Sequence, residues 1–465
     1  MTPRPILTAA GMRAAEEAVI AAGTSVETLM ERAGHAVARA AHAFSGGAPA
    51  LVLCGPGNNG GDGYVAARCL RALGVAVRVA CTGAPTTEAA RAAAAAWGGP
   101  AEALADAISA PVLIDCLFGT GLTRPLAPDI SAALARLAAA ARFTVAVDVP
   151  SGIASDDGAI LSPVPRFDCT VALGALKPAH LLQPAASRCG RLIVADIGLG
   201  ELASQSAEIA RPHLRAPGPA DHKYTRGVIA VVAGVMGGAA LLAASAAQRA
   251  GAGYVSVVGG PGGGGPHALV HRQAADPASV AELLADKRIG AIVVGPGLGR
   301  GIDARARLDA ALAADRPIVI DADAIMLLAG AAERLAGLSA PAILTPHEGE
   351  FADMFGTIGG SKIDRVRAAA LRCGQTVVLK GADSVVAHPD GRAAIAPSAP
   401  AWLASAGTGD VLAGITGAML ARGIDPFDAA CAALWLHGEA ARAAGPALIA
   451  DDLVAHLSLL LGACA

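Results

Sequence analysis

The sequence predicts an α/β protein of two domains, each built on a parallel β-sheet. Short apolar runs that are typical of buried strands alternate with alanine-rich stretches of helical periodicity along most of the chain. The alternation stops once, from Gly200 to Asp221, where the residues are polar, include prolines and show no apolar period. Such a stretch is typical of a linker. We therefore expect one domain over residues 1–210 and a second over residues 221–465.

Each expected strand is a short run rich in valine, isoleucine and leucine. In the first domain the runs are ALVLC, VAVRVA, PVLIDCLF, FTVAVDV, CTVALGA and RLIVADIG. In the second they are GVIAVVAG, GYVSVVGG, IGAIVVGPG, RPIVIDADA, PAILTPHEGE and QTVVLKGAD. The first residues of the chain, up to Gly23, mix charged and apolar residues, and they predict an amphipathic helix rather than a signal peptide.

Charge, hydropathy and cysteine usage exclude several classes of protein. A net charge of −3 and a pI near 6.4 do not show the excess of basic residues that is typical of proteins that bind nucleic acid. The apolar stretch 237–260 is interrupted by Gln248 and Arg249, so it does not read as a membrane span. The nine cysteines show no CxxC spacing, which is typical of reduced thiols. We expect a cytoplasmic protein that binds neither nucleic acid nor a membrane.

The stretch CGPGNNGGDGYVAAR, which begins at Cys54, joins the first expected strand to a helix that stops at Gly74. Glycine lets backbone N–H groups approach an anion, and a helix N-terminus adds a partial positive charge. A tight turn without any ligand would need the glycines but not three polar side chains. Asn58, Asn59 and Asp62 therefore favour a phosphate-binding or cation-binding loop.

Two further strand ends in the first domain carry an aspartate. Asp115 opens DCLFGTGLTRP and Asp148 opens DVPSG. A single aspartate at a strand end is more often a helix cap or a turn residue. Parallel strands end at one edge of the sheet, however, so these segments and the glycine-rich stretch should converge on one crevice. The oxygen atoms of Asn59, Asp115 and Ser151 are suited to a monovalent cation there.

Across nearly the whole first domain, the chain resembles the NAD(P)H-hydrate epimerase family. The resemblance rests on LMERAGHAVA, GPGNNGGDGYVAAR, DCLFGTGL, DVPSG, ALKP and ADIG, in this order. It implies a Rossmann-like α/β/α sandwich that binds a hydrated nicotinamide cofactor by its pyrophosphate and ribose. The substrate-binding residues that it implies are Asn58, Asn59, Gly60, Gly61, Asp62, Gly119, Thr120, Gly121, Leu122, Thr123, Arg124, Pro125 and Asp148.

The same resemblance assigns chemistry to a few of these residues. It implies that Asn59, Asp115 and Ser151 bind potassium, and that Asp148 transfers a proton during inversion at the hydrated carbon. Lys177 in ALKP is a candidate assistant, although a lysine is more often a solvated surface group. The chain departs from the family at Gly11, where an acidic residue is usual.

The second domain carries a separate group of candidate catalytic residues in SAGTGDVLAGITGAMLARG. Gly407 and Gly409 precede or open a helix, so their N–H groups would face the oxygens of a transferring phosphate. Asp410 lies in the first helical turn. An aspartate there is often only a cap worth roughly 1 kcal/mol, but in phosphoryl transfer it would accept the proton of an attacking hydroxyl. TPHEGE adds His347 at a strand end, suited to metal and phosphate, although a lone histidine is more often structural.

From about Asp221 onward the chain resembles the ribokinase-like family, and within it the ADP-dependent NAD(P)H-hydrate dehydratases. HKYTRG, RAGAG, VVGPGLGR, DADAI, TPHEGE, LKGADS, AGTGD and LHG carry the resemblance. It implies a ribokinase-like α/β domain that uses ADP and magnesium. The residues implied at the hydrate are Ala239, Gly297, His347 and Asp410. Those implied at the nucleotide are Lys380, Gly381, Ala382, Asp383, Ser384 and Gly409.

Together the two resemblances imply a bifunctional, homo-oligomeric repair enzyme for hydrated NADH and NADPH. Phosphorylation turns the hydroxyl of the hydrate into a good leaving group, and an epimerase supplies the isomer that the phosphorylating site accepts. Two alternatives stay open. The second domain could be an ordinary small-molecule kinase, because the glycine turn and Asp410 fit that role equally well. The first domain could be a non-catalytic binding module.

Overall fold

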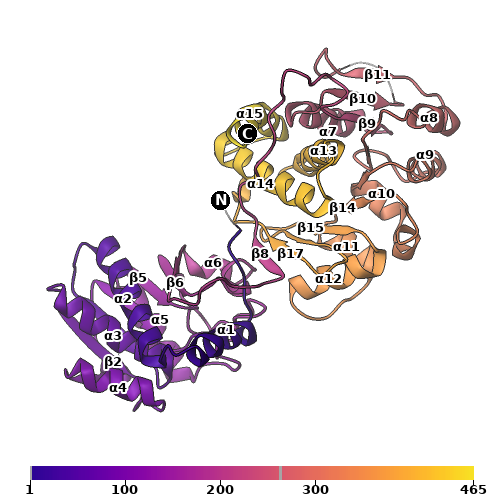
Figure 1. The fold of residues 1–465 in the computed structure, drawn as a ribbon. Helices are drawn as coiled ribbons and strands as arrows, with labels where there is room; N and C mark the ends of the chain where they lie inside the picture. The colour runs from indigo at the N-terminus through magenta and orange to yellow at the C-terminus, as the bar shows by residue number, and fades with distance from the viewer. Residues whose placement is uncertain (1–2, 261–263) are drawn as a thin grey trace. The chain divides into compact units, whose positions relative to one another are not determined.

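The computed structural model describes residues 3–260 and 264–465, which form two compact units (Figure 1). The first unit holds Arg4–Ser206 and the second holds Ala207–Ala465 together with Pro3. Each unit has its own β-sheet. The α/β class predicted for both halves of the chain is therefore confirmed.

The first unit is built on a sheet of seven parallel strands in the order β3-β2-β1-β4-β5-β6-β7. The chain order reverses between β1 and β4, so loops leaving these strands open a crevice at their carboxyl ends. The strands are β1 (Ala50–Cys54), β2 (Val77–Cys81), β3 (Ala101–Ala103), β4 (Val112–Cys116), β5 (Phe143–Val147), β6 (Cys169–Leu173) and β7 (Arg191–Ala195).

Helices cover both faces of this sheet, because alternate residues of each central strand point to opposite faces. Val52 and Cys54 of β1 belong to a core shared with α2, α3 and α4, whereas Leu51 and Leu53 belong to a core shared with α5. The unit is thus an α/β/α sandwich, as expected. Its helices are α1 (Ala9–Ala21), α2 (Val26–Ser45), α3 (Asn58–Ala72), α4 (Glu88–Trp97), α5 (Pro128–Ala140) and α6 (Ala186–Cys189), with short 3-10 turns η1 (Leu104–Asp106) and η2 (Pro178–His180).

The second unit contains a sheet of ten strands in the order β11-β10-β9-β12-β13-β14-β15-β16-β17-β8. The strands from β11 to β15 are parallel, and β16 and β17 then pair antiparallel. They are β8 (Ser206–Glu208), β9 (Val228–Val232), β10 (Tyr254–Val258), β11 (Val270–Arg272), β12 (Ala291–Val294), β13 (Ile318–Ile320), β14 (Ala342–Leu344), β15 (Thr376–Leu379), β16 (Val385–Ala387) and β17 (Ala393–Ile395).

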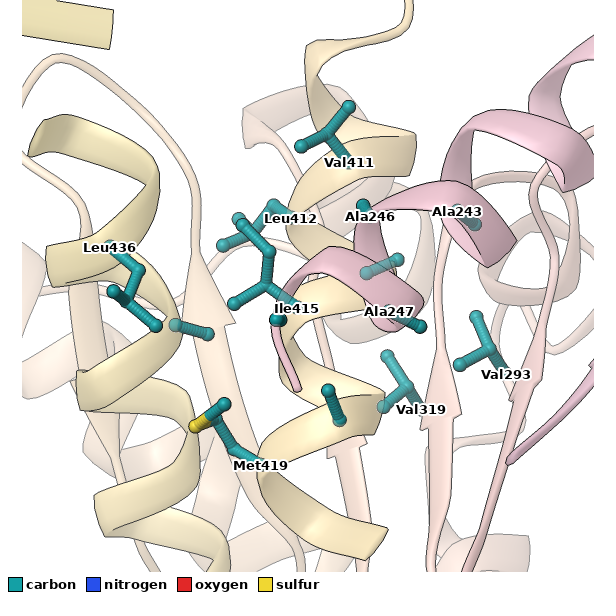
Figure 2. Close-up of a cluster of buried hydrophobic side chains, with 14 of the residues drawn as sticks. Ala243, Ala246, Ala247, Val293, Val319, Val411, Leu412, Ile415, Met419 and Leu436 are labelled. Carbon is teal, nitrogen blue, oxygen red and sulfur yellow. The ribbon is translucent and has the colours of Figure 1, made fainter. Parts of the chain in front are cut away.

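The main core of the second unit lies between this sheet and helices α7, α13, α14 and α15 (Figure 2). Ala246 and Ala247 of α7 lie near Ile415 of α13 in this core, and the small alanine side chains let the two helices approach closely. The helices are α7 (Gly237–Arg249), α8 (Pro277–Leu284), α9 (Ile302–Ala313), α10 (Ala322–Leu327), α11 (Glu348–Phe355), α12 (Lys362–Cys373), α13 (Thr408–Ala421), α14 (Pro426–Ala444) and α15 (Ala450–Ala463), with 3-10 turns η3 (Ala332–Leu335) and η4 (Ala401–Leu403).

Two local expectations differ from the structure. The stretch from Gly200 to Asp221 is not simply a linker, because it contains β8, and Ile209 and Leu214 are buried in the core of the second unit. The glycine-rich stretch after β1 is mostly helix rather than loop. Only residues 55–57 form a turn, and α3 begins at Asn58, so both asparagines and Asp62 lie in its first turns.

All nine cysteines are free, and seven of them are buried. That the thiols are reduced stays a prediction. Among the helices that the structure describes, none is long and apolar enough to cross a membrane.

Candidate active sites

The first unit contains a cavity of 730 Å³ at the carboxyl ends of its central strands. It is lined by the beginning of α3, by the loop after β4, by Asp148 after β5 and by one face of α1. Ten predicted substrate-binding residues meet there: Asn58, Asn59, Asp62, Gly119, Thr120, Gly121, Leu122, Thr123, Arg124 and Asp148. Gly60, Gly61 and Pro125 do not line it.

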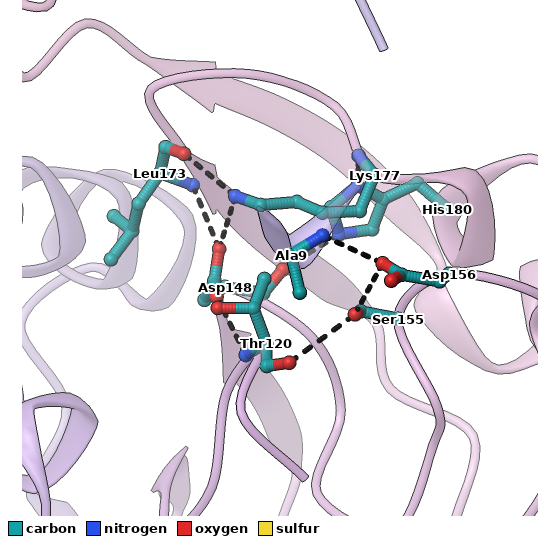
Figure 3. Close-up of polar contacts among 8 residues, drawn as sticks. All are labelled: Ala9, Thr120, Asp148, Ser155, Asp156, Leu173, Lys177 and His180. Atoms are coloured by element: carbon teal, nitrogen blue, oxygen red, sulfur yellow. Dashed lines mark hydrogen bonds and ion pairs between the residues drawn. The ribbon is translucent and has the colours of Figure 1, made fainter. Parts of the chain in front are cut away.

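Asp148 and Lys177 form a buried ion pair in this cavity (Figure 3). The Lys177 side chain is only 1% exposed, and its Nζ also donates to the Leu173 carbonyl at 2.7 Å. The other carboxylate oxygen of Asp148 accepts from the Thr120 backbone N–H at 3.1 Å. Burial raises the pKa of Asp148. The adjacent Lys177 ammonium lowers it by more, so the net pKa of the carboxyl group is below its ordinary value.

His180 supports the backbone of Asp148. Its Nδ1 accepts from the Lys177 N–H at 2.9 Å, so the ring proton lies on Nε2 and is donated to the Asp148 carbonyl at 2.6 Å. Burial, together with the charge of Lys177, lowers the pKa of His180 to about 4. The imidazole is therefore neutral at pH 7. It supports an unusual backbone, because Asp148 has φ +65°, in the left-handed region.

Two further acids face the same cavity. Asp62 is buried, and desolvation followed by the charges of Asp148 and Glu16 raises its pKa well above the ordinary value. Glu16 on α1 also has a raised pKa, through burial and then through Asp148. The cavity thus combines one ionised carboxylate with two carboxyl groups that hold protons more tightly.

Asp115 and Ser151, two of the predicted cation ligands, lie behind the cavity wall. Both are fully buried. Ser151 Oγ donates to Asp115 Oδ1 at 2.7 Å, and the Ser151 N–H donates to Oδ2 at 3.0 Å. Burial raises the pKa of Asp115, and the bonds from Ser151 only partly oppose it. The Phe118 carbonyl oxygen lies 3.2 Å from Ser151 Oγ, which adds a further oxygen to the cluster.

Asn59, the third predicted ligand, borders the neighbouring Gly119. A Cβ at Gly119 would lie 3.1 Å from Asn59 Oδ1 and 2.9 Å from Asp148 Oδ2, so glycine is the residue that lets these side chains approach. The buried Asn59 Nδ2 has no hydrogen-bond partner within the described part of the chain. Such an atom is costly to bury unpaired, and the adjoining cavity offers space for an acceptor.

Gly60 and Gly61 have a packing explanation. A Cβ at Gly60 would lie 1.9 Å from the Gly55 carbonyl oxygen, and one at Gly61 would lie 2.5 Å from Met30 Cε. Their lack of side chains lets α3 approach the turn after β1 and the neighbouring helix α2. A role in binding substrate stays a prediction for both.

The second unit has a cavity of 660 Å³ beyond the carboxyl ends of β14 and β15. Six predicted residues line it: His347, Lys380, Gly381, Ala382, Ser384 and Gly409. Asp383 does not line it, because its carboxylate pairs with Lys362 Nζ at 2.6 Å. Trp435, His437, Glu439 and Arg442 of α14 close the cavity. Most of the lining is apolar with a few convergent polar groups, as is usual for a small-molecule site.

Asp410 lies in the first turn of α13, next to Gly409 of this cavity. Burial and then the charge of Asp321 raise its pKa to about 6, and Lys380 opposes the rise. Lys380 Nζ is fixed by Asp321 Oδ1 at 2.8 Å. A carboxyl group with a pKa near 6 accepts a proton at pH 7 more readily than an ordinary aspartate. The geometry thus places a carboxyl group, an ammonium group and the N–H groups of a first helical turn at one end of α13.

His347 caps helix α11 as well as lining the cavity. Its Nδ1 accepts from the N–H groups of Gly349 and Glu350 at 3.0 and 3.2 Å, while Glu350 Oε2 accepts from the His347 N–H at 2.8 Å. This capping box gives the histidine a structural role. Its Nε2 lies 3.4 Å from Glu350 Oε1, and the side chain as a whole is 61% exposed.

Ala239 and Gly297 are adjacent but do not line the 660 Å³ cavity. A Cβ at Gly297, where φ is +63°, would lie 3.0 Å from Ala239 Cβ. The same loop is tied to α10, because Asp323 Oδ2 accepts from the Gly299 N–H at 2.9 Å. Asp323 in turn contributes to the raised pKa of Asp410.

Sequence patterns missed several residues of both sites. His180 and Glu16 occur in no strand-end motif, and only the folded chain brings them to Asp148 and Asp62. Trp435, Glu439 and Arg442 lie on a helix whose pattern is mainly apolar. The LHG triplet, whose histidine is His437, was the only sequence signal on that helix.

Comparisons with known proteins match both units. The model of the family described as YjeF-related protein N-terminus matches residues 26–179, and the model described as NAD(P)H-hydrate dehydratase matches residues 229–458. A bifunctional NAD(P)H-hydrate repair enzyme of Mycobacterium tuberculosis is 38% identical over 90% of this chain and 89% of its own length. That of Escherichia coli K12 is 35% identical over 97% and 92%. Among solved structures, the ADP/ATP-dependent NAD(P)H-hydrate dehydratase of Bacillus subtilis, co-crystallised with ATP and Mg²⁺, covers 54% of this chain and 95% of its own at 30% identity, with a TM-score of 0.46.

Proposed function

The chain belongs to the family of bifunctional NAD(P)H-hydrate repair enzymes, and from this premise we propose which cavity performs which activity. The first unit epimerises the R and S hydrates of NADH and NADPH. The second unit dehydrates the S hydrate at the expense of ADP. The observation that carries the first assignment is the buried Asp148–Lys177 pair in the 730 Å³ cavity, because a binding scaffold has no need of it.

Epimerisation requires the hydroxyl to leave one face of the hydrated carbon and to return on the other. Protonation of the hydroxyl lets the lone pair of the ring nitrogen expel water. Water then adds to the opposite face and loses a proton. We assign the proton transfers to Asp148 with Lys177 beside it: the Lys177 ammonium supplies the proton that the departing hydroxyl takes, the Asp148 carboxylate accepts the proton that the adding water loses, and a proton passing from Asp148 to Lys177 restores the pair. Asn58, Asn59, Asp62 and residues 119–125 hold the pyrophosphate and ribose.

Asp115, Ser151 and Asn59 are proposed to hold potassium. The Asp115 carboxylate is fully buried, and in the described residues it accepts only from neutral N–H and O–H donors. A monovalent cation would supply the missing positive charge and would lower the raised pKa of this group. Thermal unfolding provides a readout apart from activity: potassium should raise the Tm of the first unit in wild type and not in Asp115→Asn.

Dehydration begins with phosphoryl transfer to the hydroxyl of the S hydrate. Asp410 accepts the hydroxyl proton, the oxygen attacks the terminal phosphorus of ADP, and AMP leaves. The ring nitrogen then expels phosphate, and loss of a neighbouring proton restores the dihydropyridine. The N–H groups at the start of α13, including that of Gly409, offset charge on the phosphate oxygens. Ala239, Gly297 and His347 are assigned to the hydrate.

The nucleotide is assigned to Lys380, Gly381, Ala382, Asp383, Ser384 and Gly409. Five of these six residues line the 660 Å³ cavity, and Asp383 fixes Lys362 beside it. Magnesium would offset the charge of the phosphates. The described residues contain no group of three or more His, Cys, Asp or Glu placed to hold a metal, so we propose that magnesium enters with the nucleotide.

One assay tests both activities. The purified chain is incubated with mixed R and S hydrates plus ADP or ATP and magnesium, and the absorbance of the restored dihydronicotinamide is followed. We expect nearly complete recovery, faster with ADP than with ATP. Recovery that stops at the S fraction would contradict the first assignment. A stable phosphorylated alcohol in place of dihydronicotinamide would favour an ordinary small-molecule kinase.

Two further properties are proposed, a compartment and an oligomeric state. Nine free and mostly buried cysteines are consistent with a reducing compartment such as the cytoplasm. A homo-oligomer is also proposed, and light scattering of the purified chain tests it directly.

A further inference from the structure

A second cavity of the second unit gathers arginine side chains away from the proposed nucleotide site. It has a volume of 420 Å³, and Arg215, Arg226 and Arg422 line it, with Asp221, Thr225 and Gly251. Three segments that carry the family resemblance meet here: HKYTRG supplies Arg226, RAGAG supplies Gly251, and the end of the SAGTGD segment supplies Arg422. None of these three residues lines the 660 Å³ cavity.

The cavity lies at the edge of the sheet opposite to the proposed catalytic cavity. Arg226 precedes β9 and Gly251 precedes β10, so both mark the amino ends of parallel strands. Lys380 and His347 follow β15 and β14, at the carboxyl ends of the same parallel set. Helix α13 connects the two edges, because Gly409 lies in its first turn and Arg422 caps its last.

Two of the three arginines, Arg226 and Arg422, are anchored by backbone oxygens rather than by carboxylates. Arg422 donates to the Arg215 carbonyl at 2.7 Å, and Arg226 donates to the Gly251 carbonyl at 3.3 Å. Neither Arg226 nor Arg422 forms an ion pair with a described residue. Asp221 pairs with Arg215 through both oxygens at 2.9 Å, so the one aspartate of the cavity is already engaged.

The three positive charges disfavour one another, and an open space lies beside them. Burial, then Arg226 and then Arg215, lower the pKa of Arg422 below its ordinary value. Gly251, where φ is +99°, leaves the space beside Arg422, because a Cβ there would lie 3.3 Å from Nη1 and 2.8 Å from Leu461 Cδ2. Like charges gathered around an open space are relieved by an anion.

We propose that Arg215, Arg226 and Arg422, called here the arginine pocket, form a binding site for a small phosphate-bearing anion. Guanidinium groups match phosphate oxygens through paired N–H donors, which a spherical halide cannot use, and three guanidinium groups around one cavity suit an anion with more than the single charge of one carboxylate. This site is separate from both proposed active sites, and the inference does not rest on their assignment.

Calorimetric titration of the full chain with pyrophosphate tests the proposal. Wild type should show a binding event that Arg226→Gln weakens about tenfold or more and that Arg226→Gln/Arg422→Gln abolishes. Arg334→Gln is the matched control, because Arg334 pairs with Asp309 outside the pocket. Arg226 is exposed, so its single variant should fold, and it decides the test if the double variant does not.

Pyrophosphate could also bind near Lys380, so Lys380→Ala separates the two locations. The arginine-pocket event should survive in Lys380→Ala. A parallel titration with inorganic phosphate distinguishes a site for one phosphate group from a site for two. The proposal is overturned if wild type does not bind pyrophosphate, if the double variant binds like wild type, or if Lys380→Ala loses all binding.

Discussion

Asp410 illustrates how one residue's surroundings fit it to its proposed task. Burial and the nearby Asp321 raise its pKa to about 6, while Lys380 limits the rise. At pH 7 the Asp410 carboxyl group is ionised in most molecules and can accept a proton. Its protonated form is then acidic enough to give that proton back.

We predict that Asp410→Asn lowers the rate of S-hydrate dehydration about 100- to 10,000-fold, because a general base is removed. In wild type, dehydration should fall on the acid side with an apparent pKa near 6, since protonated Asp410 cannot accept the hydroxyl proton. Epimerisation by Asp410→Asn should equal that of wild type. A variant that dehydrates at near wild-type rate would reduce Asp410 to a helix cap.

His180 and His437 give each unit one buried neutral imidazole. Burial lowers the pKa of both to about 4, against 6.5 in an unfolded chain. Between these values the unfolded state binds a proton that the folded state does not, so the free energy of unfolding falls as the pH decreases from 6.5 toward 4. The slope is about 1.4 kcal/mol per pH unit for each histidine.

We therefore predict that acidification from pH 7 to pH 5 lowers the Tm of both units in scanning calorimetry. His180→Gln should flatten the pH dependence of the first unit's transition only, and His437→Gln that of the second unit's only. Each variant serves as the control for the other. An unchanged slope in either variant would show that carboxylates, not the buried imidazole, control acid stability.

For single residues, the sequence predicted the site residues that lie in recognisable motifs. It missed the site residues that only folding brings next to them. Asp148 ends a strand in a recognisable segment, so it could be singled out. The sequence offered Lys177 only as a candidate assistant. Its contact with Asp148 depends on a buried turn after β6 that no periodicity reveals. His180 supports the Asp148 backbone through a carbonyl oxygen, an interaction that leaves no residue pattern.

Among elements, the packing of α7 against α13 relies on small residues. A Cβ at Gly414 of α13 would lie 2.0 Å from the Ala243 carbonyl oxygen of α7, so any side chain must separate the two helices. This contact belongs to the main core of the second unit (Figure 2), and Gly414 lies about one helical turn after Asp410 in α13.

We predict that Gly414→Ala lowers the free energy of unfolding by about 1–3 kcal/mol, the usual cost of overpacking a core. Gly462→Ala is the matched control, because nothing lies within 4 Å of a Cβ at that position in α15. It should be neutral or stabilising by roughly 0.5 kcal/mol through its helix propensity. Urea unfolding measures both, and equal stabilities would refute the close approach of α7 and α13.

The sequence predicted most parallel strands well and missed five short strands, of which β3, β8 and β11 lie at sheet edges and β16 and β17 lie inside the second sheet. Strands such as β1 and β9 are five-residue apolar runs, a strong signal. Strands β3, β8, β11, β16 and β17 have three residues each, too few for a reliable alternation. The helical start at Asn58 was missed because glycine and asparagine are poor helix formers, and packing overrides their propensity.

For the whole molecule, separate cores predict separable activities. We predict that Asp148→Asn dehydrates the S hydrate at the wild-type rate but stalls once that isomer is consumed. Asparagine tolerates the left-handed backbone at this position, where φ is +65°, better than alanine would.

The measurement is total cofactor recovered from a mixed hydrate pool, over a time shorter than spontaneous epimerisation. Wild type should approach full recovery, and the variant should stop near the S fraction. Full recovery by the variant would assign epimerisation to another residue. Loss of both activities would mean that the aspartate is structural.

The peptide bond between Ser206 and Ala207 has a consequence for metabolic control. Two enzymes made from separate genes can drift in abundance, so that one isomer accumulates whenever the epimerase is scarce. Here one translation event delivers one copy of each cavity, and the molar ratio of the two sites is one in every cell. A change in expression level then scales both sites together, and the ratio of epimerising to dehydrating sites does not depend on it.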